Sequence, residues 1–249
     1  MQVPFSAGIF KRRKDMIPKK IHYCWFGKGE KPKKAQKCIA SWKKYCPDYE
    51  IIEWNEDNFD IKQYPYAAYC LENKKYAFLS DFVRLVVINE HGGIYFDTDV
   101  ELIRSPDGLL QYDAFYGFEN DEFVATGLGF GAVRGHETVR KMLELYLALE
   151  PDEGGAYPII GCPRLNTEAL LSFGLKQNGK EQTVGGARIL PADFFNPYDD
   201  PTGKLNLTKN TVSIHWYSKS WMSKKSILRS TITKPFHRLF GKDCFERLK

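Results

Sequence analysis

The 249-residue sequence has no uninterrupted apolar run of about 18 residues, the length that a transmembrane helix needs. Its amino terminus lacks the apolar stretch that follows the charges of a secretory signal peptide. Six cysteines are present without a C-x-x-C pair, which argues against a zinc site and favours reduced thiols. From these absences we expect a soluble, cytoplasmic protein. A compact domain of this size buries about three-quarters of the surface that its unfolded chain exposes, so it needs no disulfide bond or metal site to fold.

The glycine motifs of the common nucleotide-binding folds are also missing. Neither G-x-G-x-x-G nor G-x4-G-K-[S/T] occurs, which excludes a Rossmann dinucleotide site and a P-loop. A phosphatase of the haloacid dehalogenase type is excluded as well, because its Asp-x-Asp signature requires Thr or Val at the position that Glu101 occupies here.

The net charge of +5 is unevenly distributed along the chain. Basic residues crowd 11–44 and the end of the chain, whereas 48–101 and 119–153 are rich in carboxylates. In a protein that binds nucleic acid we would expect basic residues to be distributed more uniformly, so we expect no nucleic-acid partner. The basic ends suit some other anionic partner.

Strands and helices alternate along the sequence. Apolar residues at helical spacing predict helices over 33–45, 80–91, 136–149 and 166–173. Short β-rich runs predict strands over 21–26, 49–54, 94–96, 115–118, 128–132 and 212–215. The first strand, helix and strand fit a right-handed βαβ unit, and the whole pattern predicts one α/β domain over 16–223. Residues 1–15 lack periodicity and are interpreted as an extension or alternative start.

Two of these boundaries rest on particular residues. Ser80 and Asp81 are good helix starters, so we expect the second helix to begin there and to run about ten residues. Gly92 and Gly93 should end it, because glycine adopts the left-handed backbone angles that are usual at helix ends.

A pair of carboxylates, Asp97 and Asp99, directly follows the strand predicted over 94–96. An isolated D-x-D is common on solvated surfaces, but ligands of open α/β sheets bind at the carboxyl ends of strands. Two carboxylates there can share one Mg²⁺ or Mn²⁺, which takes its remaining ligands from a diphosphate and water. Such an ion would stabilise the charge on a departing nucleoside diphosphate.

The motifs around this pair resemble those of one enzyme family. The segments S-D-F-V-R at 80–84 and G-G-I-Y-F-D-T-D-V at 92–100 resemble the S-D-x-x-R…G-G-x-Y-x-D-x-D block of glycosyltransferase family 32, which the glucosylating clostridial toxins share. I-P-K-K-I-H-Y-C-W-F-G at 17–27 resembles the family's opening, and weaker matches lie at 41–54 and 161–163 and around His215 to Trp221. The resemblance covers about residues 16 to 222. It implies a GT-A type nucleotide-sugar transferase fold, a single mixed, mostly parallel sheet flanked by helices.

The resemblance also implies a metal site. Asp99 matches the residue that ligates the metal directly, and Asp97 the one that holds the ribose and reaches the ion partly through water. His215, which ends the strand predicted over 212–215, resembles the late ligand that completes the metal shell in related retaining enzymes. A lone histidine is more often a hydrogen-bonded core residue, but Mn²⁺ accepts imidazole readily. The implied cofactor is therefore Mn²⁺ or Mg²⁺, bound by all three residues.

Further residues match the family's donor site. Asp81 and Arg84 lie one helical turn apart and match residues that hydrogen-bond the donor sugar; the alternative is a surface ion pair. Tyr95 matches a residue near the diphosphate, and Trp25 matches the ring that stacks on the nucleobase; either could instead be a core aromatic. The contacts to the β-phosphate would come from a loop that contains Ser218, Ser220 and Trp221.

The function that this resemblance implies is a retaining hexosyl transfer in which Asp97, Asp99, Arg84 and Asp81 act at the reaction centre. The donor would be a UDP-hexose, with GDP-mannose as the second choice. The acceptor would be a hydroxyl of a bacterial polysaccharide or a lipid-linked glycan. The alternative is a module that binds a sugar nucleotide or glycan without turnover.

The basic segment 224–249 interleaves apolar and cationic residues, a pattern typical of a segment that lies on anionic lipid. We expect it to dock on the cytoplasmic face of the membrane; the alternative is a final helix packed on the domain. Pro235 and Gly241 predict two short helices rather than one long helix.

Overall fold

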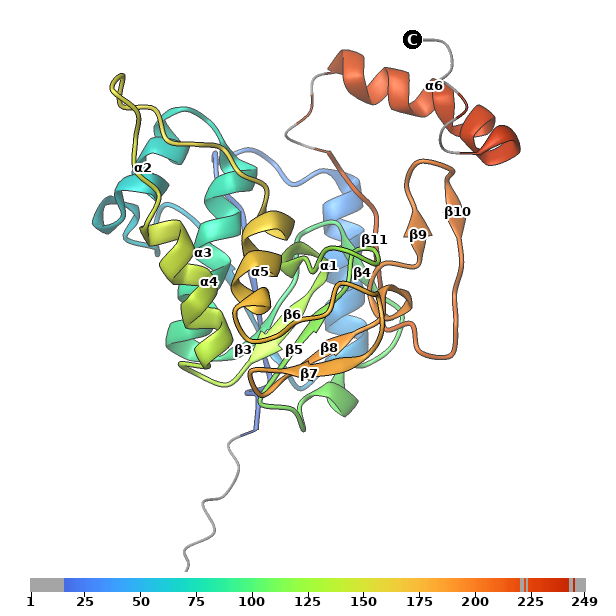
Figure 1. Cartoon of the computed structure of the whole chain (residues 1–249), viewed down its shortest axis with the longest axis horizontal. Coiled ribbons are helices and arrows are strands. Elements are labelled where there is room, and N and C mark those ends of the chain that lie inside the picture. Colours follow the sequence, from blue (N-terminus) through green and yellow to red (C-terminus); the bar gives the residue numbers. More distant parts are fainter. Residues whose placement is uncertain (1–15, 220–221, 223, 242–243, 245–249) are drawn as a thin grey trace, which may run out of the picture.

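The computed structural model describes residues 16–219, 222, 224–241 and 244. Within this part of the chain, a mixed seven-stranded sheet forms the centre of the molecule, with the strand order β2-β1-β3-β6-β5-β8-β7 (Figure 1). Its strands are β1 Lys20–Cys24, β2 Glu50–Trp54, β3 Gly93–Tyr95, β5 Ala114–Gly117, β6 Phe130–Ala132, β7 Gln182–Val184 and β8 Ala187–Leu190. Five strands run in one direction and β6 and β7 run against them, which confirms the mixed, mostly parallel sheet.

The opening βαβ unit forms as predicted. Helix α1 (Lys33–Tyr45) connects β1 to β2, which pair in parallel with Ile21 opposite Ile51. The helix follows Pro32 and ends at Cys46, where Pro47 cannot continue it. The apolar face that predicted this helix carries the buried residues Ala35, Cys38 and Trp42, and Ser41 beside them is buried as well.

Helix α3 (Tyr76–His91) begins earlier than predicted, and the expected start at Ser80 is wrong. The hydroxyl of Ser80 donates to the carbonyl of Tyr76 inside the helix, so this side chain bonds back to the preceding turn and does not cap the helix. The predicted end is correct. Gly92 has φ +63° and Gly93 φ +109°, and a Cβ on Gly93 would lie 2.9 Å from the carbonyl oxygen of Lys20.

Helices cover both faces of the sheet. One apolar cluster joins β3 and β5 to α3 and to the three helices α2 (Pro65–Glu72), α4 (Glu137–Leu147) and α5 (Cys162–Leu171). The other lies between the sheet and α1. Neighbouring residues of β3 divide between them, because Ile94 enters the second cluster and Tyr95 the first. The sequence did not predict α2, and α5 begins at Cys162, before the expected position.

Smaller elements complete the described fold. Two two-stranded sheets are formed by β4 (Val100–Leu102) with β11 (Ser213–His215) and by β9 (Tyr198–Asp199) with β10 (Lys204–Leu205). Single 3₁₀ turns are η1 Ile61–Gln63, η2 Asp107–Leu109, η3 Thr126–Leu128 and η4 Ala192–Phe194. The β4–β11 pair determines the site, because it places His215 opposite Val100 and so beside the D-x-D pair.

The final described helix, α6 (Lys224–Phe240), is continuous, so the prediction of two short helices is wrong. Pro235 lies inside it, where a proline removes one backbone hydrogen bond without always ending the helix. Gly241, with φ +90°, follows the last turn, and its amide donates to the carbonyl of His237. Across the described residues, no helix is both long and apolar enough to span a bilayer.

Candidate active site

A cavity of about 980 Å³ opens at the carboxyl ends of β1 and β3. The described residues that the sequence predicted for the site are all in its lining, except Tyr95. They come from the segment just after β1, from α3, from the loop after β3, from the end of β11 and from the loop that follows it: Trp25, Asp81, Arg84, Asp97, Asp99, His215 and Ser218. Ser220 and Trp221 lie outside the described residues.

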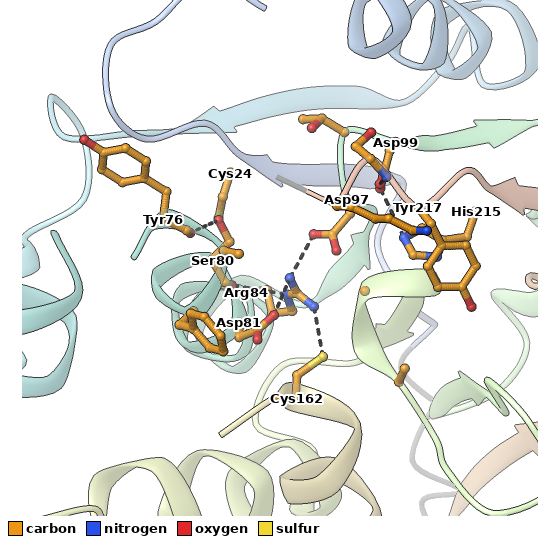
Figure 2. A pocket seen from close by; sticks show the side chains of 18 of the residues that line it. Cys24, Tyr76, Ser80, Asp81, Arg84, Asp97, Asp99, Cys162, His215 and Tyr217 are labelled. Carbon is orange, nitrogen blue, oxygen red and sulfur yellow. Dashed lines mark hydrogen bonds and ion pairs between the residues drawn. The ribbon is translucent and has the colours of Figure 1, made fainter. Parts of the chain in front are cut away.

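Arg84 is buried at the base of the cavity, between two carboxylates (Figure 2). One nitrogen, Nη2, lies 2.8 Å from Asp81 and 2.9 Å from Asp97, while Nε donates to the carbonyl of Ser80 and Nη1 to the hydroxyl of Thr126. Only 2% of the Arg84 side chain is exposed. The alternative of a surface ion pair is therefore wrong.

Burial and the neighbouring charges shift the pKa values of Asp81, Asp97 and Arg84. Burial raises the pKa of Asp81 to about 6 and also raises the pKa of Asp97, although Arg84 opposes both shifts. Burial alone would lower the pKa of Arg84, but the two carboxylates raise it well above its usual value. The guanidinium therefore stays charged and holds both carboxylates in fixed positions.

Asp97, Asp99 and His215 form a cluster that could hold a metal ion. Each offers a ligand atom, and these atoms lie within 4.8 Å of one another. Asp99 contacts His215 Nε2 at 3.2 Å through one oxygen and accepts the amide of Ser218 at 2.6 Å through the other. Nδ1 of His215 is buried and has no hydrogen-bond partner among the described residues. Two carboxylates and an imidazole are a suitable donor set for Mn²⁺, and the carboxylates also suit Mg²⁺.

The same contacts control the charge of Asp99. Burial would raise its pKa, but His215 and the amide of Ser218 together lower it well below its usual range. Burial would likewise lower the pKa of His215, and Asp99 raises it instead. Both contacts favour the ionised form of Asp99, which is the form that binds a hard cation.

Trp25 follows β1 directly and is half-buried in the cavity wall. Its indole Nε1 donates to the carbonyl of Gly29 at 2.6 Å, and Nζ of Lys31 lies 5.6 Å from the ring centre. The ring also packs against the second apolar cluster. Trp25 is therefore placed so that it could contact a ligand, while also contributing to the core.

Tyr95 lies beneath the cavity instead of in its lining. Its side chain is buried, its hydroxyl donates to Asp97 at 3.0 Å, and its ring lies 4.8 Å from the guanidinium carbon of Arg84. Within this structure Tyr95 orients the two residues that line the cavity. It has no part in the lining itself.

Sequence reasoning missed several residues of the cavity. Glu119, after β5, lines it beside Tyr217, whose hydroxyl donates to Glu119 at 3.3 Å. Burial raises the pKa of Glu119, while His215 and Tyr217 oppose that shift. Gly127 approaches so closely that a Cβ there would lie 2.6 Å from a carboxylate oxygen of Asp97. Glu119 lies in an acidic segment that resembles an exposed surface, and Gly127 belongs to no recognised motif. The sequence therefore did not indicate that either residue lines the cavity.

Comparisons with known proteins fit this geometry. Residues 32–116 match the family model described as a glycosyltransferase sugar-binding region containing a DXD motif. Over 140 residues the chain is 31% identical to inositol phosphoceramide mannosyltransferase 3 of Schizosaccharomyces pombe (strain 972 / ATCC 24843). That match covers 53% of this chain and 38% of the relative, so the chain matches much less than the whole length of that protein.

A solved structure shares the fold. PaToxG glycosyltransferase superposes with a TM-score of 0.51 at 20% sequence identity, over 64% of this chain and 69% of that one. The likeness and the mixed sheet flanked by helices confirm the expected GT-A fold. The resemblance to the DXD-containing glycosyltransferases is therefore confirmed, and residues 32–116, which include Asp97 and Asp99, match the model of their sugar-binding region.

Proposed function

We propose that this chain is a glycosyltransferase that moves a hexosyl group from a nucleotide sugar to an acceptor hydroxyl. One observation carries the proposal. A single cavity at the carboxyl edge of the sheet contains both the Asp97, Asp99 and His215 cluster and the buried Arg84 group. The family match over residues 32–116 supports the same assignment.

The nucleotide would lie along the wall that Trp25 forms, with its base against the indole ring. The sugar would lie toward Asp81 and Arg84, whose carboxylate and guanidinium can accept from and donate to hydroxyl groups. Asp97 lies between the two regions, because it contacts Arg84 and also belongs to the metal-ligand cluster. The diphosphate therefore belongs between Trp25 and Arg84, near Ser218.

Asp97, Asp99 and His215 would hold Mn²⁺ or Mg²⁺. When bound, such an ion supplies positive charge that stabilises the diphosphate as it departs. The residues around it are fixed in advance: Asp99 accepts the amide of Ser218, and Arg84 holds Asp97. Catalysis then rests on positioning and on charge arranged before the reaction begins.

We propose retention at the anomeric carbon, with attack on the face that the diphosphate leaves. The carboxylates Asp81, Asp99 and Glu119 already contact Arg84, His215 and Tyr217, respectively. A departing phosphate oxygen that accepts the proton of the acceptor hydroxyl would make a separate protein base unnecessary. The bond from the anomeric carbon to the diphosphate breaks, and a bond to the acceptor oxygen forms.

UDP-hexose is the favoured donor, and GDP-mannose is the second candidate, since the name of the fungal relative is that of a mannosyltransferase. The acceptor is proposed to be a bacterial polysaccharide or a lipid-linked glycan. A thermal-shift panel of UDP- and GDP-sugars with Mn²⁺ would select the donor, since a ligand of the native state raises the midpoint of unfolding.

The decisive experiment measures metal-dependent hydrolysis of that donor by the purified chain and by Asp99→Asn. We expect the variant to be at least about 100-fold slower with a nearly unchanged melting temperature, because an amide cannot supply the negative charge that a metal ligand provides. Asp57→Asn, at an exposed carboxylate near Lys28, is the matched control and should retain full activity. Full turnover by Asp99→Asn would reject the mechanism, and donor binding without turnover by the unaltered chain would favour the binding module.

A further inference from the structure

Helix α6 contacts the rest of the molecule through polar side chains. Nζ of Lys219 donates to the hydroxyl of Ser230 at 2.6 Å. On the next turn, Nζ of Lys234 lies 3.0 Å from Asp200 and donates to the hydroxyl of Tyr198 at 2.9 Å. In Figure 1 the helix lies beside the β9–β10 hairpin, away from the central sheet.

Most apolar residues of α6 are exposed, and Ile227 is half-buried. Leu228 is 61% exposed, Ile232 58% and Leu239 75%. Residues at this spacing lie on one face of a helix, and Ser230 and Lys234 fall roughly half a turn away from them. The amphipathic helix is thus attached by its polar side, with its apolar side directed away from the domain. The helix does lie against the domain, as the alternative expected, but it does so through its polar side and not through these exposed apolar residues.

The charge of α6 limits what can cover this face. Its sequence contains five basic residues and no acidic residue. Lys234 is engaged by Asp200, whereas Lys225, Arg229 and Arg238 are exposed. A second copy of the helix would bring five more positive charges to the same face, which disfavours self-association. A surface that is apolar inside and anionic outside matches both features.

We propose that α6 is a docking helix that lies in the interface of an anionic lipid bilayer. Leu228, Ile232 and Leu239 enter the acyl region, together with the exposed Phe240 at the end of the helix. Arg229 and Arg238 contact the lipid phosphates. This inference rests on the orientation of α6 and does not depend on the proposed function.

The docking helix follows directly on the candidate active site. Tyr217, Ser218, Lys219 and Met222, in the segment between β11 and α6, all line the cavity. A bilayer under α6 would therefore lie close to the cavity, and this consequence does rest on the proposed function. It favours a lipid-linked acceptor over a free polysaccharide.

The test is co-sedimentation of the full chain with vesicles of phosphatidylcholine alone and of phosphatidylcholine mixed with phosphatidylglycerol, at low and high salt. We expect binding to the anionic vesicles that weakens as salt screens the charges. Leu228→Ser/Ile232→Ser should lower the partition coefficient at least about tenfold. Arg229→Gln/Arg238→Gln should lower it about thirtyfold, from roughly 1 kcal/mol for each basic residue.

Leu147→Ser/Leu171→Ser is the matched control, because it removes two exposed leucines from α4 and α5 and should bind vesicles normally. Circular dichroism would verify that each variant is folded. Equal binding to the two kinds of vesicle, or unchanged binding by both α6 variants, would overturn the proposal. So would a concentration-dependent dimer that Leu228→Ser/Ile232→Ser abolishes, since a second copy would then cover the face. Donor hydrolysis, measured in parallel, tests the proposed function separately, because no α6 substitution touches the cavity lining.

Discussion

Arg84 is almost fully buried, and it is held in place by Asp81 and Asp97. A buried ion pair contributes little net stability, because desolvation cancels much of the attraction. The contacts of Arg84 with Asp81 and Asp97 are better explained by their effect on Asp97, whose orientation they fix. The spacing S-D-x-x-R was enough to predict that Asp81 and Arg84 share a face. Their burial was not predictable, since it depends on Thr126 and Cys162, which approach Arg84 from distant parts of the chain.

Gly127→Ala tests how tightly this group is built. A Cβ at this position would lie 2.6 Å from Asp97 and 3.1 Å from Nη1 of Arg84, so one of the two side chains must move. We expect donor hydrolysis to fall about tenfold or more, because small displacements of catalytic groups reduce rates strongly. Gly108→Ala is the control, since a Cβ there meets nothing within 4 Å. Unchanged hydrolysis by Gly127→Ala would show that the exact position of Asp97 is unimportant.

Trp25→Ala tests the proposed stacking on the nucleobase. The indole lines the cavity and also packs on the core, so the substitution can affect both nucleotide binding and the stability of the fold. We expect nucleotide binding to weaken by about 1 to 3 kcal/mol, the value of one aromatic–base contact. Calorimetry would measure it, and Trp25→Phe, which keeps a ring, should recover most of the affinity. A lower melting temperature with unchanged affinity would assign Trp25 to the core alone.

At the scale of elements, local sequence patterns predicted most strands of the central sheet. They did not predict contacts between segments that are far apart in the sequence. The βαβ unit and the strand before Asp97 were predictable, because periodicity and glycine punctuation act over a few residues. The pairing of β4 with β11 joins segments far apart in the sequence, and no local pattern specifies it. His215 was therefore placed beside Asp99 by family resemblance, whereas Glu119 had neither signal.

The junction of β1 with the end of α3 contains a buried histidine that makes the fold sensitive to acid. His22 is stacked on Trp54, which donates to its Nδ1, while its Nε2 donates to the carbonyl of Gly92. Burial lowers its pKa to about 4, and the neighbouring His91 and Lys20 add to that shift, whereas the Gly92 carbonyl and Glu50 oppose it. The native state therefore keeps His22 neutral at a pH where the unfolded chain binds a proton.

Unfolding by urea would measure the consequence. The stability that neutral His22 confers is fully present above the ordinary pKa of 6.5 and is lost as the pH falls toward 4. Between about pH 7 and about pH 4.5 this loss should be about 2 kcal/mol. The glutamine of His22→Gln cannot titrate but can still donate to the carbonyl of Gly92. Over this pH range the free energy of unfolding of the variant should therefore fall by about 2 kcal/mol less than that of the unaltered chain. Parallel pH profiles of the two proteins would contradict the assignment.

On the scale of the whole molecule, the apolar residues of two layers pack on the sheet, whereas most apolar residues of α6 are exposed. The sequence pattern of α6 is the same whether its apolar face meets a domain or a membrane. In this structure Asp200 holds the polar side of α6 against the domain, with Lys219 at 2.6 Å and Lys234 at 3.0 Å. One carboxylate thus connects the segment along the cavity, the β9–β10 hairpin and the final helix.

Asp200→Ala should release α6 while leaving the domain folded. All three side chains are partly buried, so the lysines lose an ion pair that solvent screens only in part. Local opening is expected to expose the helix to trypsin, with several-fold faster cleavage after Lys225, Arg229 and Arg238 and an unchanged pattern elsewhere. Lys234 precedes a proline and should stay uncut. Asp152→Ala, which removes a loop carboxylate that accepts the amides of Gly154 and Ala156, is the control and should leave those cleavages unchanged. Equal cleavage of α6 in Asp200→Ala and the unaltered chain would mean that other contacts hold the helix in place.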